Sequence, residues 1–465
     1  MKKEHPTFES SMDKLRNQIP KIRSLLQKAG LSFPAIDFQV VSKEYLLQTA
    51  AYLVPGRIGF WKHGSDYEQL VNELDSGGGR IFECMFNGAN PIGLLFEDNT
   101  LIENYLVSAH GMVHADFFAN NDSFRRTRKD MLEVIPYFTG IIEKYKKEYG
   151  ELAVEQALED AYSFWMFIDL EKRQRPHPEE QIQLWLSQYN NSLDSMSFPF
   201  VPDGDLMGFL IDFSPKMTML ERNIFAMVRE MAYYFRVQTE TKIMNESWAA
   251  LWHKRIMHIL SSELGFTATE EREWQFLNTK GTVITQERFS PYAFLAVFEY
   301  LEDYYNGTLL PGEAEWIANN EISLPPLNKG RSSLSPGRQM ILKVRSETKN
   351  DREFISKYLD YNIIRRMGLK DVKEGDWQRY KSSLLQMLDY YPNILVTEGD
   401  HLDKHELVIH HVDNVELDRK HLELALEKLV RLWGARVHFQ TVVDEERVTF
   451  LADGNKVLKR KTSSP

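Results

Sequence analysis

The stretch Leu101–Asn121, LIENYLVSAHGMVHADFFANN, decides how the rest of the chain is interpreted, because it is largely apolar and carries two histidines. In an α-helix, residues three, four and seven positions apart share a face. The predicted helix therefore has one face made of Leu106, His110, Val113, His114 and Phe117. Glu103, one heptad before His110, lies on the same side. The stretch predicts a helix whose apolar face carries a pair of imidazoles.

A second stretch, Thr241–His253, TKIMNESWAALWH, has a similar pattern, because Glu246 and His253 are seven residues apart and share a helical face. Imidazole nitrogen and carboxylate oxygen are ligands for divalent Zn, Mn and Fe. Two such helices could close around an ion. We therefore expect a divalent metal (Zn, Mn or Fe) to be held by His110, His114 and Glu246. His253 is expected as a fourth ligand or as a proton carrier.

The same histidines have a plainer interpretation, in which they are hydrogen-bonded residues of a helical core. The spacing of His110 and His114 matches the two-histidine half of the zinc motif H-E-x-x-H. The residue after His110 is Gly111, so the glutamate that acts as general base in that motif is missing and peptidase chemistry is disfavoured. Two hypotheses stay open: a metal-dependent hydrolase, and a non-enzymatic regulatory or scaffolding protein with a buried His/Glu polar network.

Other polar residues are weaker candidates for ligands. Asp116 lies about 160° around the helix from His114, so it is predicted to be a capping group or a supporting partner. Four histidines gather near the C-terminus, at His401, His405, His410 and His411. Because side chains alternate across a strand, neighbouring histidines there point to opposite faces. We expect this cluster to lie on a solvated strand.

The composition combines ample apolar material with an acidic balance. Of the 465 residues, 43% are hydrophobic, and the formal net charge is −11 at pH 7. Such a chain lacks the broad positive field that attracts nucleic acid or an anionic membrane, so neither is expected as a partner. The single cysteine, Cys84, permits no internal disulfide and fits a reducing compartment.

The N-terminus, Met1–Leu15, is charged and is followed by no apolar segment of the kind that signal peptides contain. No apolar run approaches the length of about 18 residues that a transmembrane helix needs. We therefore expect a cytoplasmic protein without a membrane span.

Apolar residues recur at helical spacing over most of the first 321 residues. Helices are predicted at Phe8–Gly30, Lys43–Leu53, Ser123–Glu148, Glu151–Ile168, Ser214–Leu264 with a break near Val237–Thr241, and Tyr292–Tyr305. The segments Arg80–Phe86 and Ile92–Phe96 flank turn-forming residues and predict a β-hairpin. Residues 1–321 are therefore expected to form a large, mostly α-helical domain with a small hairpin.

Composition changes at Ile322–Gln339, ISLPPLNKGRSSLSPGRQ, which is rich in Pro and Ser and is predicted to be a linker. Residues 340–465 follow as a smaller α+β domain with a basic tail, Lys456–Lys461. Its predicted strands are Met340–Val344, Asn393–Thr397, Leu407–Val412, Val437–Val443 and Arg447–Leu451, and its predicted helices are Asp351–Met367, Asp376–Asp389 and Asp418–Trp433. The fold class predicted for the whole chain is α+β.

Several catalytic classes are disfavoured because their motifs are missing. The sequence has no G-x-S-x-G nucleophile elbow and no G-x4-G-K-[ST] phosphate loop. The run Gly77–Gly79 precedes a predicted strand and does not open a helix, unlike a dinucleotide-binding loop. Serine hydrolases, nucleotide hydrolases and nicotinamide enzymes are therefore not expected.

Five blocks of the sequence resemble the stage V sporulation protein R (SpoVR) family. They are RIFECMFNGANP, LVSAHGMVHADFFANN, YYFRVQTETKIMNESWAALWH, SPGRQMILKVR and LVRLWGARVHFQTVV, and they extend the likeness over about residues 35–450. The chain departs from the family pattern at Phe60-Trp61, Gly111 and Ser247. It therefore resembles a divergent member.

The resemblance implies a process more than a reaction. Members are linked with formation of the spore cortex, and they tend to accompany a serine protein kinase of the PrkA type. The family supplies no catalytic residues to transfer, so the catalytic residues stay unknown. His110, His114, Glu246 and His253 match positions in its most recognisable blocks.

Overall fold

The computed structural model describes most of the chain. The described residues are 8–52, 83–172, 198–199, 201–283, 291–320, 324–327, 333–388, 391–401, 404–413, 415–454 and 457–461, with a few positions between 176 and 187. Phe60-Trp61, Gly77–Gly79 and the first part of the predicted strand Arg80–Phe86 lie outside them.

The chain contains two compact units, each built from two separate segments. Unit 1 consists of Met1–Val134 and Val237–Leu388, and unit 2 of Ile135–Arg236 and Asp389–Pro465. These contacts place residues 340–388 with the N-terminal helices. The division into 1–321, 322–339 and 340–465 stays a prediction from composition.

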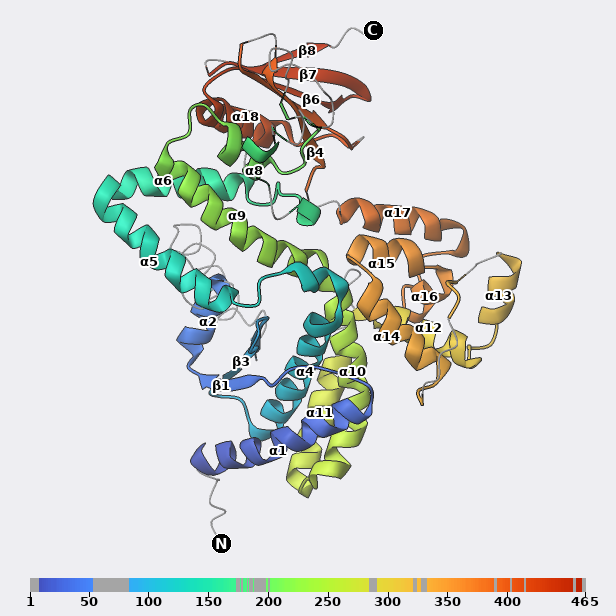
Figure 1. Cartoon of the computed structure of the whole chain (residues 1–465). Helices are drawn as coiled ribbons and strands as arrows, with labels where there is room; N and C mark the ends of the chain where they lie inside the picture. Colours follow the sequence, from blue (N-terminus) through green and yellow to red (C-terminus); the bar gives the residue numbers. More distant parts are fainter. Residues whose placement is uncertain are drawn as a thin grey trace. The chain divides into compact units, whose positions relative to one another are not determined.

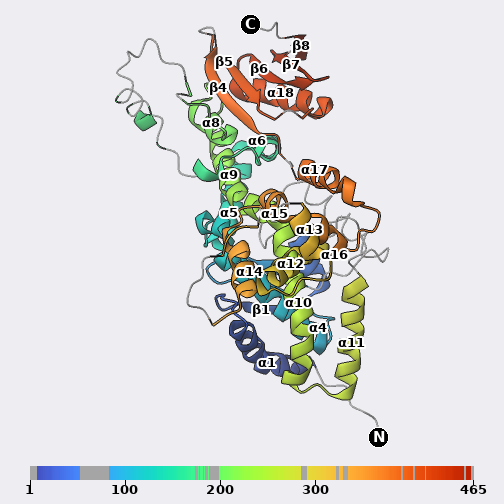
Figure 2. The same ribbon diagram turned by 90° about the vertical axis from the view of Figure 1, so that its right-hand side faces the viewer.

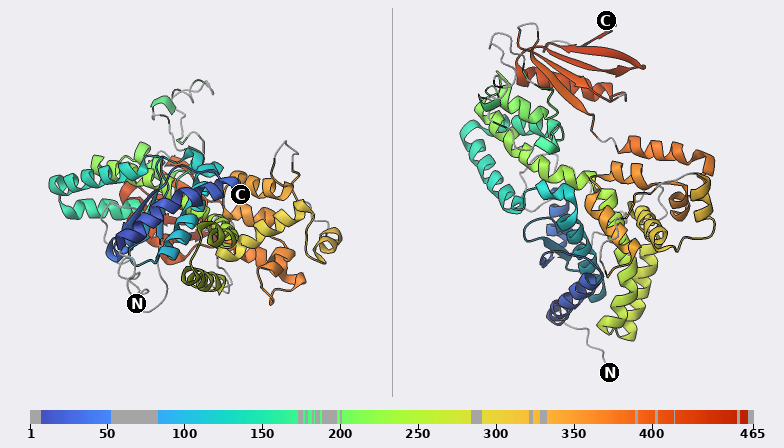
Figure 3. Two further views of the ribbon diagram at one scale, coloured as in Figure 1. Left: turned by 90° about the horizontal axis from the view of Figure 1, so that it is seen from below. Right: turned by 45° about the vertical axis from the view of Figure 1, so that its right-hand side comes forward.

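Unit 1 is mainly helical (Figure 1). Its described helices are α1 (Phe8–Lys28), α2 (Lys43–Tyr52), α4 (Leu101–Asn120), α10 (Lys242–Leu264), α11 (Ala268–Val283), α12 (Leu295–Asn306), α13 (Glu313–Asn319), α14 (Pro336–Glu347), α15 (Asp351–Tyr358), α16 (Tyr361–Arg366) and α17 (Trp377–Met387), with the 3₁₀ turns η1 (Asp122–Arg126), η5 (Pro291–Phe294) and η6 (Glu374–Asp376). Helices α4 and α10 pack against each other, and α1 and α11 pack against them (Figures 2 and 3). The apolar periodicity explains this packing, since the regularly spaced Leu15, Ile22 and Leu26 of α1 are all buried.

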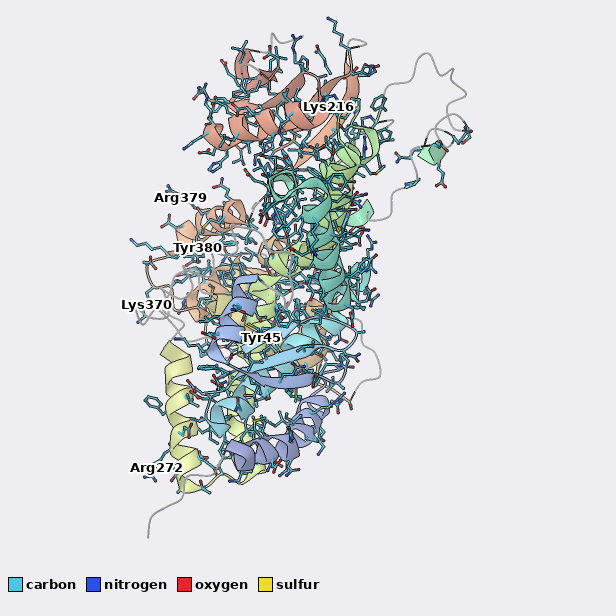
Figure 4. The ribbon with its side chains drawn as sticks, turned by 90° about the vertical axis from the view of Figure 1, so that its left-hand side faces the viewer. Tyr45, Lys216, Arg272, Lys370, Arg379 and Tyr380 are labelled. Atoms are coloured by element: carbon cyan, nitrogen blue, oxygen red, sulfur yellow. The ribbon has the colours of Figure 1, made fainter. Side chains whose placement is uncertain are left out.

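A three-stranded sheet lies beside α4 in unit 1. Strands β2 (Glu83–Phe86) and β3 (Ile92–Phe96) form the predicted antiparallel hairpin, which is confirmed. The sequence pattern missed β1 (Asp37–Val41), which pairs in parallel with β3 (Figure 4). Gly93 on β3 is required by this pairing, because a Cβ atom there would lie 2.6 Å from the ring of Phe38.

Unit 2 combines helices with a five-stranded sheet. Its elements are α5 (Met131–Tyr149), η2 (Leu170–Lys172), α6 (Glu151–Phe164), α8 (Leu206–Phe213), α9 (Met219–Glu240), β4 (Ile394–His401), β5 (Glu406–His411), α18 (Arg419–Trp433), β6 (Val437–Val443), β7 (Glu446–Ala452) and β8 (Val457–Lys461); α5 begins and α9 ends in unit 1. The strand order is β4-β5-β6-β7-β8, with β5 and β6 parallel and the other pairs antiparallel. Helix α18 connects the two parallel strands, as a parallel connection requires. The basic tail forms β8 at one edge.

The predicted fold class, α+β with a helical bulk, is confirmed, and so are most predicted elements. The break in the long helical tract falls at Thr241, between α9 and α10, as predicted. Among the described helices, none combines the length and the apolarity needed to cross a membrane.

Several local predictions are wrong. Met340–Val344 is part of helix α14 and not a strand, because Ser335 caps the helix, Pro336 begins it, and Met340, Ile341 and Val344 are buried at helical spacing. The last four residues of the predicted linker form the first turn of α14. The predicted helix Asp351–Met367 is two helices, because Asp360 caps a new one.

Another wrong prediction concerns the C-terminal histidines. Strand β5 lies between β4 and β6 and is buried along most of its length, so it is not a solvated strand. His411 is 1% exposed, and its Nδ1 lies 2.9 Å from the hydroxyl of Thr441. His405 lies at the turn before β5 with a positive φ of 54°. The four histidines therefore differ in environment, which alternation along one strand does not reveal.

Candidate metal centre

Helix α4 has a firmly capped beginning that accounts for one of its predicted polar residues. The amide of Glu103 donates to Thr100 Oγ1 at 3.1 Å, and the amide of Thr100 donates to Glu103 Oε2 at 2.8 Å. This reciprocal capping box gives the backbone amides of Thr100 and Glu103 one acceptor each. Glu103 therefore serves to start the helix that carries the histidines.

Three side chains of α4 and α10 converge farther along these helices. His110, His114 and Glu246 each offer one ligand atom, and the three atoms lie within 4.8 Å of one another. His110 and His114 meet because they are four residues apart, and their rings pack edge to face with centroids 4.6 Å apart. Glu246 reaches them because α10 packs along α4. The structure thus brings together three of the four side chains that the sequence nominated.

Asn245 orients one of the imidazoles. His114 Nδ1 lies 3.0 Å from Asn245 Oδ1. An amide oxygen only accepts, so Nδ1 carries the hydrogen, and in the neutral imidazole Nε2 keeps its lone pair. His114 Nε2 lies 3.9 Å from Glu246 Oε2. Sequence reasoning missed Asn245, although its place next to Glu246 was a usable signal, since ligand histidines commonly donate their other N–H to a supporting group.

His253 lies beside the group of three rather than within it. Its ring centroid is 6.0 Å from that of His110, and the two rings are nearly perpendicular. Burial, followed by the neighbouring His114 and His253, lowers the pKa of His110 well below its usual value. Burial also lowers the pKa of His253, to about 4. Both imidazoles are therefore neutral at pH 7, the protonation state in which histidine binds metals.

Asp116 points to a different part of α4's surroundings, as its angular position predicts. Its carboxylate accepts from the amide of Ser32 at 2.7 Å and from Trp248 Nε1 at 3.0 Å, and Arg345 Nε lies 3.6 Å away. Burial raises the pKa of Asp116, while Arg345 and the two hydrogen bonds oppose that shift. Because Trp248 belongs to α10, this contact ties the two helices together.

The comparison with a family model covers four of the five sequence blocks, and the fifth, Leu429–Val443, lies beyond the matched residues. The family model described as SpoVR like protein matches residues 9–390. The chain belongs to the SpoVR family. This SpoVR family member is also similar to YcgB of Escherichia coli (strain K12), an uncharacterized protein, with 23% identity over 89% of each chain. No solved structure matches the sequence of this family member.

Membership supports a sporulation-associated protein, and the low identity with YcgB fits a divergent member of the family. The match contains α4 and α10 in full, and it ends before strand β4. The family model therefore covers the candidate metal centre and not the five-stranded sheet of unit 2.

The spacing of the three ligand atoms in the SpoVR family member is compatible with an ion after a small contraction. Bonds of about 2.1 Å in a tetrahedral site place ligand atoms about 3.4 Å apart. The observed separations of up to 4.8 Å would close by at most about 1.4 Å, a movement within reach of side-chain rotation. Three protein ligands leave further positions open for water or substrate, which is the arrangement of catalytic rather than structural sites.

Proposed function

We propose that this sporulation-associated protein binds a divalent metal (Zn, Mn or Fe) through His110, His114 and Glu246, with His253 as fourth ligand or proton carrier. The observation that carries the proposal is the convergence of three ligand atoms from two helices that are distant in sequence. The hydrogen bond from His114 to Asn245 supports it, because that bond leaves the Nε2 lone pair directed at the centre.

The reaction that this set of ligands supports best is metal-assisted hydrolysis. A bound divalent ion supplies a Lewis acid that lowers the pKa of water. Asn245 holds His114 in one tautomer, and the ring of His253 lies beside that of His110, with centroids 6.0 Å apart. Gly111 stands where a metallopeptidase has its glutamate, so the proposed hydrolase differs from that class.

The proposed cellular role is spore cortex formation, in association with a serine protein kinase of the PrkA type. Its support is the resemblance to the SpoVR family, whose model matches most of the chain. Co-purification of the full chain with such a kinase, compared with a kinase of another type, tests the association. Equal recovery of both kinases would remove the partner from the proposal.

Elemental analysis of the purified full chain tests the metal directly. We expect about one equivalent of a transition metal per chain, because sites of two histidines and a carboxylate hold such ions tightly. Less than about a tenth of an equivalent, after purification without chelators and after reloading with Zn²⁺, Mn²⁺ and Fe²⁺ in turn, would overturn the proposal.

A second candidate is a regulatory or scaffolding protein in which these side chains form a buried polar network. The observation in its favour is that His114 already has two polar partners, Asn245 and Glu246. Thermal unfolding separates the candidates, because a ligand that binds the folded state raises the melting temperature. If Zn²⁺ raises the melting temperature of the wild type and not of His114→Ala, the metal centre is supported. If Zn²⁺ has no effect on either chain, the network is supported.

A further inference from the structure

Helix α10, which carries Asn245 and Glu246, begins without a cap from its own sequence. Thr241 precedes it, and the hydroxyl of Thr241 donates to the carbonyl oxygen of Val237 at 2.8 Å, at the end of α9. Thr241 makes no side-chain hydrogen bond to the first turn of α10. The first N–H groups of a helix have no partner within the helix, so a buried first turn needs an acceptor from elsewhere.

Asp351, the first residue of α15, supplies that acceptor. The amide of Ile243 donates to Asp351 Oδ2 at 2.7 Å, and the amide of Met244 donates to Asp351 Oδ1 at 2.8 Å. Each carboxylate oxygen therefore holds one amide of α10. Asp351 is 2% exposed and Met244 is fully buried, so water cannot replace the bond between these two residues.

We propose that Asp351 is a positioning residue of the metal centre, which fixes the first turn of α10 and with it the side chains of Asn245 and Glu246. This inference rests on the proposed function, since it assigns Asp351 to the same centre. Asn245 and Glu246 directly follow the two amides that Asp351 binds. A looser first turn would therefore move the Glu246 carboxylate and the Asn245 amide away from His114 on α4. Asp351 acts through the helix backbone and is not itself a ligand.

The two bonds depend on the protonation of Asp351. Burial is the largest influence on the pKa of Asp351 and, with Glu240, raises it to about 7, against the opposing effects of the two amides and Lys242. A protonated carboxyl turns one oxygen into a hydroxyl donor, so one of the two amides loses a good acceptor. The cap therefore weakens as the pH falls through about 7.

The raised pKa of Asp351 gives overall stability the opposite pH dependence. The carboxyl binds its proton more tightly in the folded chain than in the unfolded chain, where its pKa is about 3.9. Its contribution to the free energy of unfolding is therefore fully present below about pH 4 and is lost as the pH rises through about 7. The ionised form that holds both amides costs stability, so a metal-affinity effect and a stability effect of Asp351 respond to pH in opposite directions.

The test is the Zn²⁺ affinity of the full-length wild type and Asp351→Asn between about pH 6.5 and 8.5, measured by competition with a chelator. Zn²⁺ is the probe because N/O sites bind it more tightly than Mn²⁺ or Fe²⁺. Asparagine keeps one acceptor oxygen and cannot ionise. We expect the substitution to weaken Zn²⁺ binding about tenfold near pH 8, the lower end for supporting residues. The difference should shrink toward pH 6.5, where the wild-type carboxyl is also protonated.

Asp360→Asn is the matched control. Asp360 is another buried aspartate of unit 1, it caps α16 by accepting from the amide of Ile363 at 3.0 Å, and burial raises its pKa as well. Its substitution should lower the melting temperature and leave Zn²⁺ affinity within about twofold of the wild type, because its capping bond goes to α16 and not to α10. Equal loss of affinity in both variants would show a general effect of destabilisation and overturn the positioning role.

The outcomes separate this inference from the proposed function. Identical Zn²⁺ affinity and pH profile in wild type and Asp351→Asn overturn the role of Asp351 and leave the metal centre standing. Absence of Zn²⁺ binding by the wild type overturns the metal centre itself. If Asp351→Asn does not fold, amide hydrogen exchange in the wild type replaces it. Zn²⁺ should then slow exchange at Ile243 and Met244 and not at Ile363, and unchanged exchange at the first two amides overturns the inference.

Discussion

Two clusters of histidine and glutamate, one on α4 and α10 and one on β5 and β6, contain the same residue types but differ in the partners of the glutamate. On the strands, Glu406 is 5% exposed and binds His438 Nε2 at 2.6 Å and Arg436 Nη1 at 3.1 Å. On the helices, Glu246 faces His114, and no lysine or arginine pairs with it within the part of the chain that the structure describes.

The difference lies in what compensates the carboxylate. Arg436 is permanently cationic, so Glu406 already has the positive partner that a buried carboxylate requires. Near Glu246, burial lowers the pKa of His110 and of His253, so these two imidazoles are neutral and offer no positive charge. A divalent cation would supply the missing positive charge. A His/Glu cluster with an arginine is therefore expected to be structural, and one without an arginine is a candidate for metal binding.

The largest expected effect is loss of a ligand. His114→Ala removes one of three protein ligands, so we expect Zn²⁺ affinity to fall more than about 100-fold, beyond the range for supporting residues. Equilibrium dialysis with elemental analysis measures this. His438→Ala is the control from the other cluster and should keep full Zn²⁺ content; equal loss from both variants would erase the proposed distinction.

The next effect belongs to the strand cluster. Glu406→Ala leaves a partly buried His438 and Arg436 without their carboxylate, and we expect the free energy of unfolding to fall by about 2 kcal/mol. Urea unfolding measures the change. The Zn²⁺ content should be unaffected, and a variant that loses Zn²⁺ together with stability would show that the two clusters are not independent.

A smaller effect is expected at Asn245. Asn245→Ala frees the tautomer of His114 without removing a ligand, so Zn²⁺ affinity should fall about tenfold, equivalent to about 1.4 kcal/mol. Calorimetric titration with Zn²⁺ measures it. Asn245→Asp keeps an acceptor for Nδ1–H and should restore most of the affinity. Failure of the aspartate to do so would argue against orientation of His114 as the function of Asn245.

The smallest expected effect is a pH dependence of stability that arises from His411 in the five-stranded sheet. Burial, supported by Arg447, lowers the pKa of His411 despite the opposing Asp413. The unfolded chain therefore binds the proton more readily, and this contribution to stability is present above the unfolded pKa of about 6.5 and is lost as the pH falls through the lowered value. His411→Gln should flatten the fall in unfolding midpoint on acidification. An unchanged pH profile would remove His411 from the acid response.

Local patterns predicted the candidate ligands and the direction of Asp116, but not the partners that support these side chains. His110 and His114 are four residues apart, so any helix over Leu101–Asn121 places them together. Asn245, Asp116 and Asp351 gain their roles from contacts with segments far away in the chain, which no spacing rule describes. The strand prediction at Met340–Val344 was wrong because this run of five apolar and basic residues fits the helical period as well as the strand period. The cap at Ser335 favours the helix.

The sequence by itself determined most of the helices, the break at Thr241, the hairpin and the three candidate ligands, because periodicity and capping act over a few residues. Only the tertiary structure decided that α10 packs along α4, that β1 joins the hairpin in parallel, and that Asp351 holds the first turn of α10. Those contacts join segments far apart along the chain. Their free energy comes from burial and from partners for buried polar groups, and neither can be assigned before the chain has folded.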